Sequence, residues 1–146
     1  ESEMDTNFYL KVFKNVLSGE QHYALVKNID DKNKSYLTRM HRLDVAKDIF
    51  EEKNIFGDEI SKSFKLIEKK GSGAIVLINS EMAPKIQKIF NRRNSKDNKL
   101  ELREYGVGAQ ILLELGLHKI ILLSNNNKKI IALDGFGLEI VSQEKI

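Results

Sequence analysis

The stretch that decides the fold is "LREYGVGAQILLELGLHKIILLSNNNKK", residues 102–129. Its apolar residues first recur at a helical spacing over 105–116. They then form an apolar run within 119–125, which is typical of a buried strand. The stretch closes on three asparagines and two lysines, which indicate a polar loop. A helix, a buried strand and a polar loop in this order predict a layered α/β domain.

Elements of both kinds also flank this stretch. The run "GAIVLIN" predicts a strand that is covered on both faces. In one predicted helix Asp58 is the expected N-cap and Gly71 the expected stop. Because strands and helices alternate from residue 73 onward, we expect a largely parallel sheet there. The full set is strands at 73–79 and 138–142, helices at 58–71, 80–93 and 128–135, and a loop at 94–99.

The amino-terminal third follows another pattern. Bulky residues alternate with polar ones in 7–17, 22–29 and 36–41, and turn-forming residues separate these segments. This pattern predicts three strands in an antiparallel meander. Residues 43–56 are ambiguous and fit a short helix plus a loop. Together the segments predict one α/β domain over 1–146, with a mixed sheet and flanking helices.

Composition excludes several classes of protein. The 146 residues are 41% hydrophobic and 31% charged, as in ordinary globular domains. No apolar run approaches the roughly 20 residues of a membrane helix, so no membrane partner is expected. The net charge of +3 comes from intermixed charges of both signs, which does not favour nucleic acid. With no cysteine and no secretory signal, a cytoplasmic location is expected.

The polar segment "SNNNKK" (124–129), at the carboxyl end of the strand predicted over 119–125, is the candidate ligand site. In open α/β sheets, ligands bind beyond the carboxyl ends of the strands. Ser124 precedes a predicted short helix whose free N–H groups could hold an anion, and Lys129 would add charge. Arg103, expected just before the previous helix, could grip a phosphate or carboxylate. Alternatively, Ser and Asn side chains only cap the short helix, and the lysines are solvated.

These residues resemble a known family. Residues 102–141 are similar to the carboxyl-terminal part of GTP cyclohydrolase II, with its Tyr-Gly-x-Gly-Ala-Gln-Ile-Leu segment and its Leu-Leu-Thr-Asn-Asn-Pro loop ending in Lys. "SGEQHYALVKNID" (18–30) and "RMHRLDVAKDIF" (39–50) resemble its amino-terminal segments. The resemblance implies a GTP cyclohydrolase II-like fold. That family opens the imidazole ring of GTP and releases formate and pyrophosphate, in riboflavin synthesis.

Two motifs of the family are missing from this chain. The family's three zinc cysteines, spaced Cys-x10-Cys-x-Cys, fall on Asp44, Ile55 and Gly57. Its Arg-x-Glu-Gly-Arg-Gly-x-Gly loop corresponds to 79–86, where only Glu81 is kept. The resemblance therefore implies a degenerate domain that has lost the zinc site and most of the phosphate-binding residues.

Other positions of the family persist. By resemblance, Arg103 matches the arginine that acts at the phosphate. Glu81, Ser124 and Lys129 match substrate-binding positions, so bound GTP or phosphate is conceivable. These residues could equally be remnants that the fold itself requires.

A substitute zinc site would need other ligands. His41, Asp44 and Asp48 would share one face if that stretch were helical. Such pairs of His and Asp are common without metal. We therefore expect no metal in this domain.

The resemblance also implies a longer parent protein. In many bacteria the family's domain follows 3,4-dihydroxy-2-butanone 4-phosphate synthase in one bifunctional chain. A first residue other than Met fits a carboxyl-terminal piece of such a riboflavin-biosynthesis protein, and any Mg²⁺ would belong to the upstream synthase domain.

Three hypotheses for this domain stay open. In the first, it is an inactive structural or regulatory domain that forms a homodimer. In the second, it is a nucleotide-binding module that uses Arg103, Ser124 and Lys129. In the third, it is an active cyclohydrolase with a rebuilt metal site.

Overall fold

The computed structural model describes residues 7–15, 19–43, 57–79, 97–124, 133 and 135–146. Among these residues it contains six strands and two helices, and the mixed sheet with flanking helices confirms the predicted α/β class. The strands are β1 (Tyr9–Lys14), β2 (Gln21–Lys27), β3 (Ser35–Leu43), β4 (Gly73–Asn79), β5 (Lys119–Leu123) and β6 (Glu139–Glu144), and the helices are α2 (Gly57–Lys70) and α4 (Asp97–Glu114).

All six strands form one sheet in the order β1-β2-β4-β3-β5-β6. Strands β4, β3, β5 and β6 run parallel, which was predicted for β4, β5 and β6 but not for β3. The predicted antiparallel meander is wrong in one respect, because β4 lies between β2 and β3. Chain order would have placed β3 next to β2. The apolar strand β4 takes that place instead, and it is buried along most of its length.

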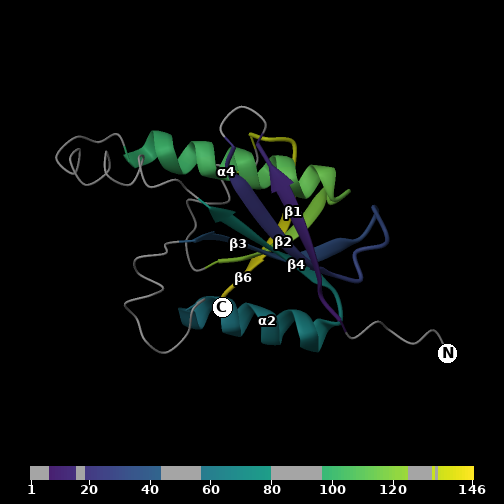
Figure 1. The fold of residues 1–146 in the computed structure, drawn as a ribbon. Helices are drawn as coiled ribbons and strands as arrows, with labels where there is room; N and C mark the ends of the chain where they lie inside the picture. The colour runs from purple at the N-terminus through teal and green to yellow at the C-terminus, as the bar shows by residue number, and fades with distance from the viewer. Residues whose placement is uncertain (1–6, 16–18, 44–56, 80–96, 125–132, 134) are drawn as a thin grey trace.

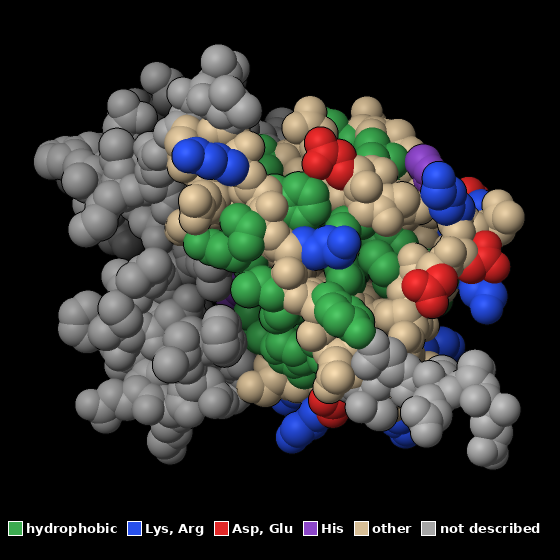
Figure 2. Space-filling model, turned by 45° about the vertical axis from the view of Figure 1, so that its right-hand side comes forward, with side chains coloured by type: hydrophobic (Ala, Val, Ile, Leu, Met, Phe, Trp, Pro, Cys, Tyr) green, Lys and Arg blue, Asp and Glu red, His purple; other side chains and the backbone are tan. Residues whose placement is uncertain are grey.

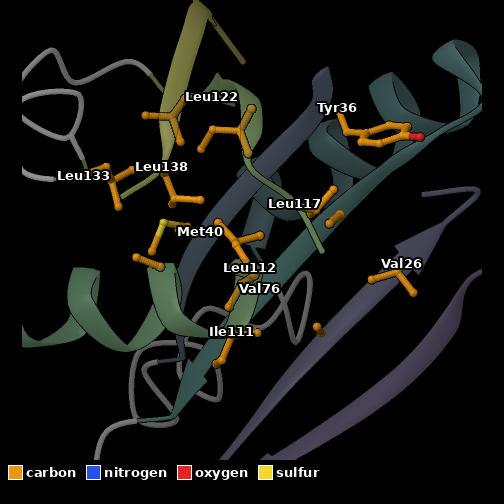
Figure 3. Packing of buried hydrophobic residues seen from close by; sticks show 14 of the residues in the cluster. Val26, Tyr36, Met40, Val76, Ile111, Leu112, Leu117, Leu122, Leu133 and Leu138 are labelled. Carbon is orange, nitrogen blue, oxygen red and sulfur yellow. The ribbon is translucent and has the colours of Figure 1, made fainter. Parts of the chain in front are cut away.

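One helix covers each face of the sheet (Figure 1). The central strand β4 is buried along six of its seven residues and sends side chains to both faces. Ala74, Val76 and Ile78 join the cluster under α4, whereas Ile75 and Leu77 join the cluster under α2. Figure 3 shows the α4 side of this core, where Met40 and Val76 from the sheet meet Ile111 and Leu112 from the helix.

Helix α2 agrees with its prediction except at its first residues. Ile60 and Ile67 are fully buried, and Phe64 packs against the same cluster. Gly71 stops the helix in a left-handed conformation (φ 89°) and donates its N–H to the carbonyl of Ile67 at 2.8 Å. The helix begins at Gly57, so Asp58 lies in the first turn instead of at the predicted N-cap.

Helix α4 begins at Asp97, eight residues before the predicted start at residue 105. Residues 97–99 were therefore wrongly predicted as loop. Their polar side chains lack the helical apolar pattern, yet an acidic residue in the first turn favours a helix amino terminus. Further along α4, a Cβ added to Gly108 would lie 1.9 Å from the Cε of Met40. A larger residue there would have to displace the end of the Met40 side chain, because the helix packs closely on β3.

Several predictions fall outside the described residues, namely the ambiguous segment at 44–56, the helix at 80–93 and most of the short helix at 128–135. The last strand, predicted at 138–142, is confirmed but runs from Glu139 to Glu144. No helix in the described part of the chain is long and apolar enough to cross a membrane.

Candidate functional site

The carboxyl ends of β3, β4 and β5 form one edge of the sheet, because these strands are parallel. Strands β3 and β4 end level with each other, with Leu43 opposite Asn79. Strand β5 is shorter: Thr38 pairs with Leu122, so β5 ends level with the middle of β3. The edge is therefore stepped, and the step at the end of β5 is where a ligand would be expected.

Arg39 lies at this step and is the most deeply buried cation of the edge, with 5% of its surface exposed. Its Nη1 donates to the carbonyl oxygen of Leu123 at 3.2 Å, and its Nη2 donates to the carboxylate of Glu59. The guanidinium thus joins β3, β5 and α2. Burial lowers the pKa of Arg39 from its ordinary value, while the nearby Glu59 and Tyr105 act in the opposite direction.

His22 holds the end of the neighbouring strand β4. It is 3% exposed, and its Nδ1 accepts a hydrogen bond from the backbone N–H of Asn79 at 3.1 Å. This bond requires a neutral ring with its proton on Nε2, which lies 3.6 Å from a carboxylate oxygen of Glu20. Burial lowers the pKa of His22, and Glu20 opposes that shift. His22 therefore fixes the point where the chain leaves β4.

Ser124 is the one predicted site residue whose surroundings the structure describes. It follows β5 directly, whereas the strand was predicted to run to residue 125, and it is 1% exposed. Its backbone N–H donates to the carbonyl of Glu144 at 3.0 Å, and its own carbonyl accepts from the side chain of Gln143. Ser124 is thus tied to β6 through its backbone, and its predicted ligand contact stays a prediction.

The other predicted site residues are placed less completely. Arg103 lies within α4, so the predicted position in a turn before the helix is wrong. Gly108 packs on Met40 and Ile78, near the carboxyl ends of β3 and β4. Arg103 lies five residues before Gly108, hence its backbone belongs to the same edge as Ser124. Glu81 and Lys129 lie outside the described residues.

A zinc site like the one that the resemblance implies does not fit the residues present. Gly57 has no side chain, and it forms the first residue of α2. Ile55 and Asp44 lie outside the described residues, and of these two only Asp44 has a donor atom. His41 lies on strand β3, so it cannot share a helical face with Asp44 and Asp48 as the alternative site required. Among the described residues, no three acidic or histidine side chains form a metal-binding group.

Comparison with known proteins identifies the family. The sequence model of the GTP cyclohydrolase II family matches residues 1–145. The chain belongs to the GTP cyclohydrolase II family. Its relatives include proteins named riboflavin biosynthesis protein RibBA. The one from Porphyromonas gingivalis (strain ATCC 33277) is 35% identical over 150 residues, which cover 92% of this chain and 37% of that protein.

Two further relatives carry the same name. The RibBA protein of Cytophaga hutchinsonii is 33% identical over 156 residues, covering 94% of this chain and 38% of that protein. The one of Aquifex aeolicus is 32% identical over 155 residues, covering 95% of this chain and 38% of that protein. The chain therefore spans well under half the length of these relatives.

Packing accounts for part of the family's sequence pattern in this chain. In the segment "YGVGAQ", Gly108 admits Met40, and a Cβ on Gly106 would lie 3.1 Å from the ring of Phe136. Both glycines thus allow α4 to approach its neighbours, whatever ligand other members of the GTP cyclohydrolase II family bind. This part of the sequence resemblance therefore reflects the packing of the fold.

Proposed function

We propose that this member of the GTP cyclohydrolase II family does not catalyse the cyclohydrolase reaction and serves as a structural or regulatory domain in riboflavin biosynthesis. One observation carries the proposal. The three positions where the family has zinc cysteines hold Asp44, Ile55 and Gly57, which together offer a single side-chain donor. A catalytic zinc needs about three protein ligands and one open position.

The surroundings of Arg39 support a structural role for the carboxyl edge. Its guanidinium already donates to the carbonyl of Leu123 and to the carboxylate of Glu59. These contacts lie within the chain and pair both terminal nitrogens of the buried guanidinium, whereas its Nε has no hydrogen-bond partner among the described residues. The cation thus stabilises the junction of β3, β5 and α2.

The remaining chemistry of the parent protein would lie outside this chain. Relatives named RibBA are more than twice as long as the part that matches. We propose that a 3,4-dihydroxy-2-butanone 4-phosphate synthase domain precedes this domain in the same polypeptide and holds any Mg²⁺ that the protein needs. The domain described above would support it as part of a homodimer.

A nucleotide-binding module is the second candidate. The observation in its favour is that Ser124 and the backbone of Arg103 belong to the same edge of the sheet. With Lys129 they could hold GTP or phosphate without catalysis. Bound ligand would then stabilise the fold by mass action, and Lys129→Ala would remove the rise in melting temperature that GTP produces.

The experiment that tests the main proposal is an assay of GTP turnover with added Zn²⁺. We expect neither formate nor pyrophosphate to be released. The control restores the family's ligands with Asp44→Cys, Ile55→Cys and Gly57→Cys together, and its zinc content is compared with that of the unaltered protein. Release of formate by the unaltered protein would contradict the proposal.

A further inference from the structure

Strand β1 exposes more apolar surface than an edge strand normally does. Leu10 is 60% exposed, Val12 55% and Tyr9 53%, and among the described residues β1 pairs with β2 alone. Figure 2 shows hydrophobic side chains gathered on this side of the molecule, with a basic side chain among them. Edge strands of this kind are usually shortened, charged or covered, since they pair readily with another strand.

The backbone of β1 shows which residues would make that pairing. The N–H of Asn15 donates to the carbonyl of Glu20 at 2.8 Å, so the backbone of Asn15 turns toward β2. Hydrogen-bonding direction alternates along an antiparallel pair. The backbone groups of Leu10, Val12 and Lys14 therefore turn toward the open edge.

We propose that β1 pairs with β1 of a second copy of this chain, antiparallel, about a two-fold axis at Val12. The six-stranded sheets of the two copies would then form one continuous sheet. The inference rests on the homodimer included in the proposed function and adds its interface. An axis perpendicular to the sheet brings outward-turned residues opposite each other, Val12 with Val12 and Leu10 with Lys14.

Charge disfavours the register shifted by one residue. A two-fold axis at Lys11 would place the ammonium groups of two copies directly opposite each other, which is destabilising. With the axis at Val12, Lys11 faces Phe13 and Lys14 faces Leu10. A lysine above an aromatic ring is a favourable contact, and this chain already has one, with the Nζ of Lys27 5.3 Å from the ring centre of Phe8.

The same register also buries apolar surface. Leu10 pairs with Leu25 and Val12 with Tyr23 inside one copy, so both side chains lie on the α2 face of the sheet. At the junction, the Leu10 and Val12 side chains of the two copies form one apolar row on that face. Such cross-strand contacts are the main stabilising unit of a sheet.

Pairing of β1 with β6 of another copy is the competing arrangement. Strand β6 has acidic ends, Glu139 and Glu144, and an exposed Val141. Strands β1 and β6 point in the same direction, because β1 and β4 are both antiparallel to β2. Contact between them would be head-to-tail, and it would build open filaments instead of a closed dimer.

The test uses the absence of cysteine from the chain. Val12→Cys places one thiol at the proposed axis, where paired Cα atoms would lie about 5.5 Å apart, within the range of a disulfide. Val141→Cys is the matched control, since Val141 is a similarly exposed valine on the other edge strand. Both variants of the 146-residue chain are oxidised, and the covalent dimer is measured.

We expect Val12→Cys to give at least about tenfold more covalent dimer than Val141→Cys, because pairing raises the local thiol concentration. Val12→Lys should weaken self-association measured by light scattering, whereas Val141→Lys should not. A monomeric protein would overturn the homodimer itself. A dimer in which Val12→Cys does not cross-link, or filaments that Val141→Lys disperses, would overturn the interface. None of these results bears on formate release, so a failure here is distinct from a failure of the proposed inactivity.

Discussion

Arg39 donates a hydrogen bond to the carbonyl oxygen of Leu123, 84 residues away in the chain, with 3.2 Å between Nη1 and oxygen. Leu123 is the last residue of β5, so this bond fixes the end of that strand against the middle of β3. Glu59 extends the connection to α2. The guanidinium of Arg39 therefore stabilises the fold at the carboxyl edge.

Replacing Glu59 should reveal how much the fold depends on this connection. Glu59→Gln removes the negative partner of a buried guanidinium, and the expected loss is about 1.5–3 kcal/mol in the free energy of unfolding. Because the Glu59 side chain is 55% exposed, the loss should fall short of that for a fully buried pair. Urea unfolding measures it.

Glu68→Gln is the control for that variant, since Glu68 is an exposed glutamate of the same helix. Its free energy of unfolding should stay within about 0.5 kcal/mol of the unaltered protein. Equal losses in the two variants would contradict the role assigned to Glu59.

The pattern of apolar residues was enough to predict every strand of the described region. It could not predict which strands are neighbours. The apolar patterns of β2 and β3 are similar, and neither pattern shows that β4 lies between these strands. It also missed the first eight residues of α4, since their sequence is mostly polar and carries no periodic signal.

Gly73 should be among the least replaceable residues of the sheet. Its φ is 155°, and an added Cβ would lie 2.6 Å from the backbone oxygen of Leu37. Gly73→Ala is expected to cost about 3–5 kcal/mol, because strain and a backbone clash combine. Gly19→Ala is the comparison: its φ is 75° with no atom within 4 Å, so about 1–2 kcal/mol is expected. Thermal unfolding of both variants decides whether the close contact matters.

Gly108 should be coupled to Met40. Gly108→Ala places a methyl group against the Cε of Met40 and is expected to cost about 1–3 kcal/mol. The cost should be smaller when Met40→Val has removed the interfering atom, so the double variant should be more stable than the sum of the single losses suggests. Additive losses in urea unfolding would show that the helix does not pack as closely as described.

His22 should make stability depend on pH. Burial lowers its pKa in the folded protein below the ordinary 6.5 of the unfolded chain. Between these two values the unfolded chain binds more protons, so the free energy of unfolding falls as the pH decreases below about 6.5. His22→Gln offers Asn79 an acceptor that does not titrate, and it should flatten this dependence.

His118→Gln, which replaces an exposed histidine, is the control variant. Guanidinium unfolding at a series of pH values measures all three proteins. A slope that persists in His22→Gln would show that another group causes it.

Prediction of the site was less complete than prediction of the fold. Ser124 was chosen because polar residues at the end of a buried strand mark a carboxyl end, and its role in ligand binding stays a prediction. Arg39 and His22 were not chosen as site residues, since each stands within a strand pattern. The signal that could have identified Arg39 is a charged residue in the middle of the apolar run "YLTRM".

Zinc content is the most direct test of the central claim that this chain has lost the metal centre of its family. The purified protein is analysed for metal after expression with added Zn²⁺, and its melting temperature is measured before and after chelation. We predict less than stoichiometric zinc and an unchanged melting temperature. The claim would be contradicted if the protein held one zinc per chain that a chelator removes and if it released formate from GTP.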